Sequence, residues 1–132
     1  MSNVYSKDRK TSPMEVVTKS RDLYVTVYKI CMNEDKVPKK HRYFIGKKLV
    51  DLTEEIMGNI IKANAIFPRT DIDKELRYKH QKEAYACCEC LLSELEAFCQ
   101  IISISYKDTE NITQLAVGTM QMIQAWIKSD NR

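Results

Sequence analysis

Apolar residues recur at intervals of three and four along much of this chain, and this spacing constrains its fold more than any other feature. The clearest run consists of Ile45, Leu49, Leu52, Ile56, Ile60 and Ala63. A helix places residues at such intervals on one face, whereas a half-buried strand needs strict alternation. Only three glycines and three prolines occur in 132 residues, too few for the many turns of an all-β fold. The sequence therefore predicts an all-α chain.

Local boundary signals divide the chain into four helices. Ser12, Pro13 and Glu15 combine a helix cap with a proline at the first helical position. Thr70–Asp73 places acids in a first turn, and Phe67–Pro68 ends the preceding helix because proline disfavours helical geometry in the residue before it. We predict helices at about 13–34, 42–66, 71–105 and 109–128, after a flexible tail at 1–11.

The length favours one domain, which we place at 12–129. Long helices with short connections favour an up-and-down four-helix bundle. The other three helices have their own apolar stripes, which should face the same core. These stripes contain Val17, Tyr24, Val27 or Tyr28, and Cys31 in the first helix; Leu76, Ala84, Cys87, Leu91, Leu95, Phe98 and Ile102 in the third; and Ile112, Leu115, Thr119, Met122, Ile123 and Trp126 in the fourth.

No apolar run approaches the roughly 20 residues of a membrane-spanning helix, and the first residues lack the apolar core of a signal peptide. We therefore expect a cytoplasmic protein. Five cysteines are an odd number, and Cys87, Cys88 and Cys90 fall within one predicted helix, which disfavours a disulfide framework. Cys87 and Cys90 have the spacing of a metal-binding pair, but no second pair or nearby histidine completes four ligands. We expect structural thiols, with no metal and no cofactor.

Enzymatic chemistry has little support in the sequence. The chain has two histidines, and His80 precedes Glu83 in the reverse of the order found in di-iron bundles. His80 is therefore expected to be a polar surface residue. No glycine-rich phosphate loop or nucleophile elbow is present, so we predict a protein that is not an enzyme. Trp126 is expected to be buried in its own bundle, with a contact to a neighbouring subunit as the alternative.

The charge is distributed unevenly. The net charge is only +3, but residues 1–48 contain 12 Lys or Arg against 5 Asp or Glu, and residues 49–132 contain 9 against 13. Six cations fall within the thirteen residues 36–48, which contain no acid. They are Lys36, Lys39, Lys40, Arg42, Lys47 and Lys48. A solvated charged turn is the ordinary explanation of such a run.

The helix dipole favours a functional explanation instead. The other three predicted helices have acids in their first turns, whereas the second begins with Arg42, Lys47 and Lys48. Cations are disfavoured there by about 0.3–1 kcal/mol each. Such a cluster suits phosphate oxygens, so we predict that these six residues bind nucleic acid by shape and charge. Tyr43 and Phe44 are expected to pack against the bundle, and at most they offer a stacking face.

Three segments resemble a known family. The stretch Val37–Leu49, followed by Ile60–Asn64, looks like the accessory variability determinant, Avd, of diversity-generating retroelements. The stretch Leu115–Lys128 is similar to that family's last helix, with a comparable arrangement of Gly118 and Trp126. The resemblance extends from about Met14 to Lys128 and rests on the order and spacing of these segments.

The resemblance implies a four-helix subunit that assembles into a pentameric ring. It implies a basic surface that binds a reverse transcriptase and nucleic acid, either the template RNA or its cDNA. The implied role is non-catalytic support of mutagenic retrohoming, in which a template RNA is copied into DNA. Related bundles encoded in intervening sequences of ribosomal RNA genes carry a Ser-Asn-Ile-Ala-Glu-Gly type of segment, where this chain has Gly58–Ala63. An oligomeric scaffold or adaptor of that kind, with no retroelement role, is the alternative.

Overall fold

The computed structural model describes residues 13–131. Within this range the chain is helical and contains no β-strand, which confirms the prediction of an all-α fold. The elements are α2 (Pro13–Met32), α3 (Lys39–His41), the π-helical turn η1 (Arg42–Gly46), α4 (Lys47–Ala65), α5 (Asp71–Ile101) and α6 (Tyr106–Asp130). The predicted tail at 1–11 and the predicted Ser12 cap lie outside the described residues.

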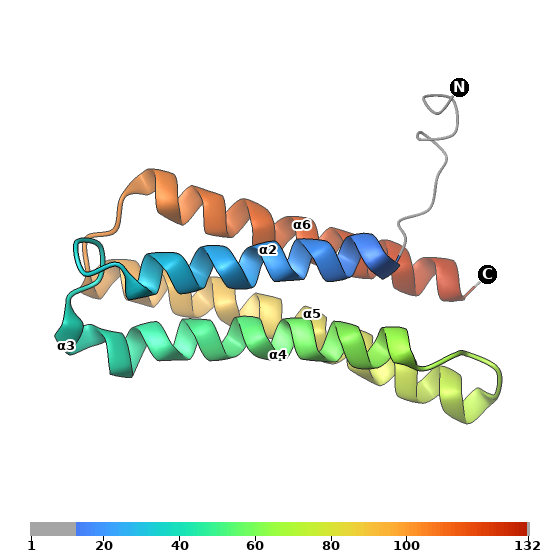
Figure 1. Cartoon of the computed structure of the whole chain (residues 1–132). Coiled ribbons are helices and arrows are strands. Elements are labelled where there is room, and N and C mark those ends of the chain that lie inside the picture. Colours follow the sequence, from blue (N-terminus) through green and yellow to red (C-terminus); the bar gives the residue numbers. More distant parts are fainter. Residues whose placement is uncertain (1–12, 132) are drawn as a thin grey trace, which may run out of the picture.

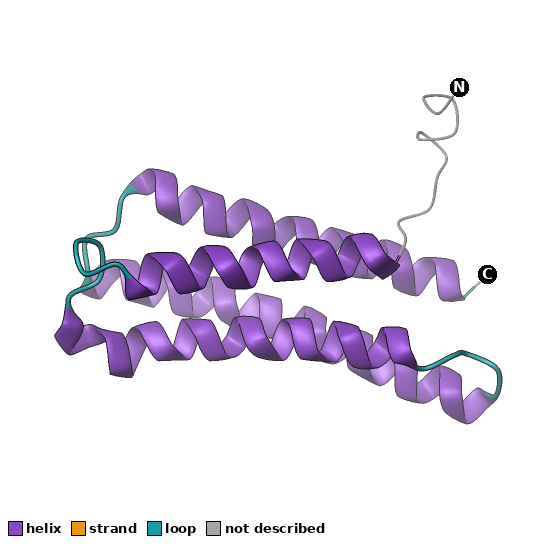
Figure 2. Ribbon diagram, in the orientation of Figure 1, coloured by secondary structure: helices purple, strands orange, loops and turns teal. Residues whose placement is uncertain are grey.

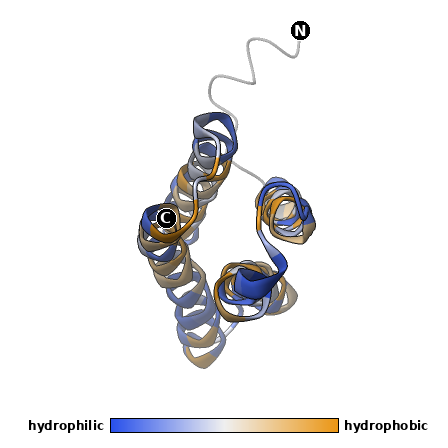
Figure 3. Ribbon diagram, turned by 90° about the vertical axis from the view of Figure 1, so that its left-hand side faces the viewer, coloured by the Kyte–Doolittle hydropathy of each residue, from blue (hydrophilic) through white to orange (hydrophobic). Residues whose placement is uncertain are grey.

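Four long helices form the body of the molecule, and successive helices run in opposite directions (Figure 1). Contacts join α2 to α4, α4 to α5, α5 to α6, and α6 back to α2, which closes a bundle. Viewed from one end, α2 and α4 form one side and α5 and α6 the other (Figure 3). The loops are confined to the two ends (Figure 2). None of the described helices combines the length and the apolar character needed to cross a lipid bilayer.

The core lies along the axis between these helices, as the apolar stripes predict. Each of the four long helices contributes side chains that are at most 2% exposed. They include Leu23, Val27, Leu49, Ile56, Ile60, Leu91, Phe98, Ile112, Ile123 and Trp126. Burial of one large apolar side chain stabilises a fold by about 1.5–3 kcal/mol, so a core of this size offsets much of the chain entropy. The expectation that Trp126 is buried in its own bundle is confirmed.

One position departs from the predicted stripes, and one open alternative is resolved. Leu76 is 44% exposed, because at the start of α5 Arg77 and Gln81 are the residues that turn inward, to Asp130 at the end of α6. In α2 the sequence left Val27 and Tyr28 as alternatives. Val27 is the buried residue, and Tyr28 is 46% exposed.

The helix boundaries follow local capping. Thr70 and Asp73 form a reciprocal capping box at the start of α5, with Asp73 N donating to Thr70 Oγ1 at 3.1 Å. α5 ends four residues before its predicted limit because Ile102 has extended backbone angles. Ser105 Oγ then accepts from Asp108 N at 3.1 Å, so α6 begins at Tyr106 and not at 109 as predicted.

Candidate nucleic-acid interface

The basic cluster lies at the end of the bundle where α2 connects to α4, a connection that is strongly hydrophilic in Figure 3. Helical structure begins here at Lys39, three residues before its predicted start, because Pro38 is extended with φ −57° and ψ 144°. α3, η1 and α4 then follow one another directly. Lys47 and Lys48 therefore lie two turns inside a helical segment, where the effect of the terminal dipole has faded. The dipole argument made from the sequence concerned Arg42, Lys47 and Lys48, and it is wrong for Lys47 and Lys48. The cations of the first turn are instead Lys39 and Lys40.

Lys36 lies in the loop before this helical segment and is tied to α6. Its Nζ lies 2.9 Å from Asp108 Oδ2, and the Asp108 side chain is only 15% exposed. The hydrogen bond from Lys36 is the main cause that lowers the pKa of Asp108, and a hydrogen bond involving Ser105 adds to it. Lys36 therefore fixes the α2–α4 connection to the start of α6, which is a structural role.

Arg42 is turned toward the bundle, with a side chain only 16% exposed. Its Nη2 lies 3.8 Å from Glu34 Oε1, too far for a hydrogen bond. Nε and Nη2 are both buried without a hydrogen-bond partner among residues 13–131. A charge reversal here would place a carboxylate in a largely buried site, so Arg42 is a poor position for testing a surface interaction.

Lys47 and Lys48 are on the surface, and each contacts one acid. Lys47 Nζ lies 2.7 Å from Asp51 Oδ2, and this hydrogen bond raises the pKa of Lys47. Lys48 Nζ lies 3.8 Å from Glu94 Oε1 on α5. Both lysine side chains are about two-thirds exposed, at 65% and 67%. Ion pairs this exposed contribute little to stability, so either ammonium group can exchange its carboxylate for a phosphate at little cost.

Lys39 and Lys40 are exposed, and within residues 13–131 neither forms an ion pair. Next to them are two aromatic side chains that also face solvent. Tyr43 is 70% exposed and Phe44 is 80% exposed. The expectation that these two residues pack against the bundle is therefore wrong. Of the six predicted site residues, Lys39, Lys40, Lys47 and Lys48 form an accessible group, which we call the basic end.

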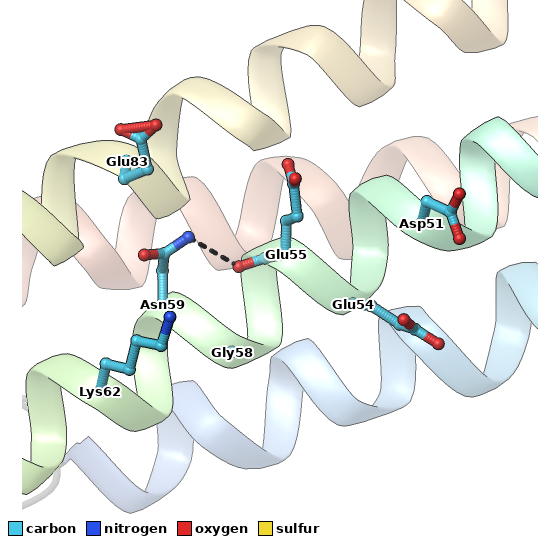
Figure 4. A pocket seen from close by; sticks show the side chains of 7 residues that line it. All are labelled: Asp51, Glu54, Glu55, Gly58, Asn59, Lys62 and Glu83. Carbon is cyan, nitrogen blue, oxygen red and sulfur yellow. Dashed lines mark hydrogen bonds between the residues drawn. The ribbon is translucent and has the colours of Figure 1, made fainter.

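A groove of opposite charge runs along the outer side of α4, a feature that the sequence analysis missed. It has a volume of about 630 Å³ and is lined by Asp51, Glu54, Glu55, Gly58, Asn59, Lys62 and Glu83. Figure 4 shows these carboxylates spread along α4, with Glu83 contributed by α5. The spacing of the acids at 51, 54 and 55 could have indicated this acidic face. The negative charge of this groove repels phosphate. A polyanion is therefore expected to bind at the basic end instead.

Two side chains next to the groove are held by polar contacts between helices. His80 Nδ1 lies 2.9 Å from Asn59 Oδ1, so His80 is half-buried and joins α5 to α4, in contrast to the expected surface position. Cys87 Sγ donates to Glu55 Oε2 at 3.4 Å. Across residues 13–131, no group of three or more His, Cys, Asp or Glu side chains is arranged to hold a metal ion.

Comparisons of the chain with protein-family models, curated proteins and solved structures found no match. Among the described residues, the basic end is the surface whose chemistry most directly suggests a ligand. Its cations can bind anions, its exposed rings can stack on flat groups, and the acidic groove beside it repels anions.

Proposed function

We propose that this protein is a non-catalytic accessory protein of a diversity-generating retroelement. It binds the phosphate backbone of RNA or DNA through the basic end and works with a reverse transcriptase in mutagenic retrohoming. The observation that carries the proposal is the exposure of Lys39 and Lys40 with no carboxylate partner among the described residues.

Phosphate is the ligand that best fits these cations. Lys39, Lys40, Lys47 and Lys48 project from one short helical segment, and only the last two contact an acid, in weak surface pairs. A polyanion that neutralises such ammonium groups releases its counterions, which favours binding at low salt. Lysine presents a point charge without the paired donors of arginine, so this surface favours recognition of backbone over base sequence.

The retroelement role and the reverse-transcriptase partner rest on the resemblance of Val37–Leu49, Ile60–Asn64 and Leu115–Lys128 to Avd. The same resemblance supports assembly into a homo-oligomer, in which several basic ends would act together and strengthen a weak single contact. Light scattering at micromolar concentration tests the assembly, and a monomer mass would contradict it. Co-purification with the reverse transcriptase encoded beside the gene tests the partner, and a failure to co-purify would count against it.

Charge reversal of the two unpaired lysines tests nucleic-acid binding. The Lys39→Glu/Lys40→Glu variant should bind a labelled RNA oligonucleotide more weakly, as measured by fluorescence anisotropy across a salt series. The slope of log K against log salt should flatten by about 0.7–0.9 for each lost phosphate contact. Arg42 stays unchanged because its side chain is largely buried.

The matched control is Lys74→Glu/Lys79→Glu, which makes the same change in net charge at two exposed positions on α5, toward the other end of the bundle. This variant should retain most of the binding and the full salt slope. Unchanged binding by a folded Lys39→Glu/Lys40→Glu variant would refute the proposed interface.

A second candidate is a scaffold or adaptor whose basic turn has no ligand. The contact between Lys36 and Asp108 favours it, because this cation already serves the fold. A scaffold predicts equal and weak RNA binding by the wild type and by both charge-reversal variants, so the same experiment separates the two functions.

A further inference from the structure

We infer that the basic end binds single-stranded nucleic acid, with bases stacked on Tyr43 and Phe44. This inference rests on the proposed function, because the same lysines hold the phosphates. It goes further in stating that the protein prefers single strands over duplexes and that two aromatic residues take part in binding.

The rings and the cations alternate along the helical segment. Lys39, Tyr43 and Lys47 are each four residues apart, and so are Lys40, Phe44 and Lys48. Residues four apart lie close to one side of a helix, and the wider π-helical turn at Arg42–Gly46 leaves all six of these side chains exposed. The segment therefore presents its two aromatic rings between ammonium groups along its outer side.

The exposure of both rings is built into this segment. Its inward side is occupied by other residues, since Arg42 and Ile45 are half-buried and Gly46 is fully buried against α2. The π-helical turn Arg42–Gly46 spans the two aromatic positions, and its backbone bond runs from Lys47 N to Arg42 O. Such turns are rare and frequently occur at functional sites. Tyr43 and Phe44 thus remain 70% and 80% exposed while their neighbours pack.

Bases explain this surface better than a protein partner does. An apolar protein pocket that covered the rings would also have to desolvate the nearby ammonium groups. This is costly above all for Lys39 and Lys40, which have no paired acid among the described residues. A single strand instead supplies a phosphate for each cation and a flat base for each ring. In a duplex the base faces are already stacked on one another, so rings on the side of a helix cannot reach them.

The test compares two single strands of equal length and charge, one with bases and one built from abasic nucleotides. The wild-type chain should bind the strand with bases about 5- to 150-fold more tightly for each base that stacks. In the Tyr43→Leu/Phe44→Leu variant this preference should disappear, while affinity for the abasic strand and the salt slope stay unchanged. The Tyr43→Phe/Phe44→Tyr variant keeps both rings and should keep the preference.

Tyr106→Leu is the matched control, because Tyr106 is also 80% exposed and is the first residue of α6, which begins at the same end of the bundle. This substitution should leave the preference for bases intact. Emission of the Phe44→Trp variant provides a second measurement that does not depend on the leucine variant folding. The strand with bases should quench it and the abasic strand should not, against a background from Trp126 that is only 2% exposed.

The outcomes separate this inference from the proposed function. Equal affinity for the two strands, with binding still lost in Lys39→Glu/Lys40→Glu, would overturn stacking and leave phosphate binding in place. The rings would then be free to serve a protein partner. Absence of binding to either strand would overturn both proposals.

Discussion

The guanidinium of Arg77 on α5 binds the carboxylate of Asp130 at the end of α6 through two hydrogen bonds. Nε donates to Oδ2 at 2.7 Å and Nη2 donates to Oδ1 at 3.0 Å. Nη1 donates to the carbonyl oxygen of Ile66 at 3.0 Å, just after α4. The guanidinium carbon also lies 5.0 Å from the centre of the Trp126 ring. One side chain thus joins three helices at the end of the bundle opposite the basic end.

Replacement of Arg77 should destabilise the fold strongly. The two side chains are only 11% and 23% exposed, and removal of Arg77 leaves a partly buried carboxylate without its main partner, at a cost of about 1–3 kcal/mol. Arg77→Lys should recover only part of this loss, because an ammonium cannot form the paired contact. Urea unfolding of Arg77→Met, Arg77→Lys and the wild type checks the order. Equal stability of Arg77→Lys and the wild type would contradict it.

The contact between Lys36 and Asp108 should make stability depend on pH in the acidic range. The folded state holds the pKa of Asp108 below its usual value, mainly through the hydrogen bond from Lys36. The stabilisation is therefore present above the unfolded pKa of about 3.9 and is lost as pH falls through the lower folded pKa. Asp108→Asn should be less stable than the wild type at pH 7, with the gap closing below about pH 4. Thermal unfolding of both proteins from pH 7 to pH 3 measures this difference in stability. A difference that does not change with pH would show that the Lys36–Asp108 contact does not stabilise the fold in this way.

The five cysteines should differ sharply in reactivity. Burial raises the pKa of Cys31 to about 11 and that of Cys88 to about 12, and burial with the nearby Glu55 raises the pKa of Cys87 to about 12. Cys90 is exposed, and Cys99 is half-buried. Iodoacetamide at pH 8 should therefore modify Cys90 first, and the three buried thiols only after unfolding. Peptide mass spectrometry reads the order directly, and early labelling of Cys88 would show that α5 opens in the native state.

Gly58→Ala should stabilise the protein by about 0.5–1 kcal/mol, since glycine is unfavourable in the middle of a helix. A Cβ at position 58 would meet no atom within 4 Å. Gly46→Ala is the comparison, because its Cβ would lie 3.4 Å from Cys31 Cβ and should gain less. Thermal unfolding measures both variants. A lower melting temperature for Gly58→Ala would mean that the groove along α4 is more crowded than the structure shows.

The helices could be predicted from the sequence because their determinants are local. The stripe from Ile45 to Ala63 and the box at Thr70–Asp73 each act within a few residues. The end of α5 was placed too late because Ile101, Ile102 and Ile104 continue the apolar pattern into a segment that is extended at Ile102. The cap at Ser105 is also local. The predicted start at about 109 was too late because it was based on the acids Asp108 and Glu110, which lie within the first turns of α6.

The candidate site was harder to predict because its character depends on distant residues. Lys36 contacts Asp108 on α6, and Lys48 contacts Glu94 on α5. The sequence could place all six cations in one cluster, but it could not show which of them the fold already uses. The exposure of Tyr43 and Phe44 depends on how the segment from Lys39 to Gly46 packs against α2. Their spacing alone does not reveal it.

The direction of the helices has a practical consequence for experiments. α2 begins and α6 ends on the same side of the molecule, and the basic end lies at the other pole (Figure 1). α2 has 20 residues, a span of about 30 Å, which separates the two poles. A fluorophore or surface tether placed near Pro13 or Asp130 would therefore hold the protein with its lysines and rings facing outward, in the orientation that immobilised binding measurements require.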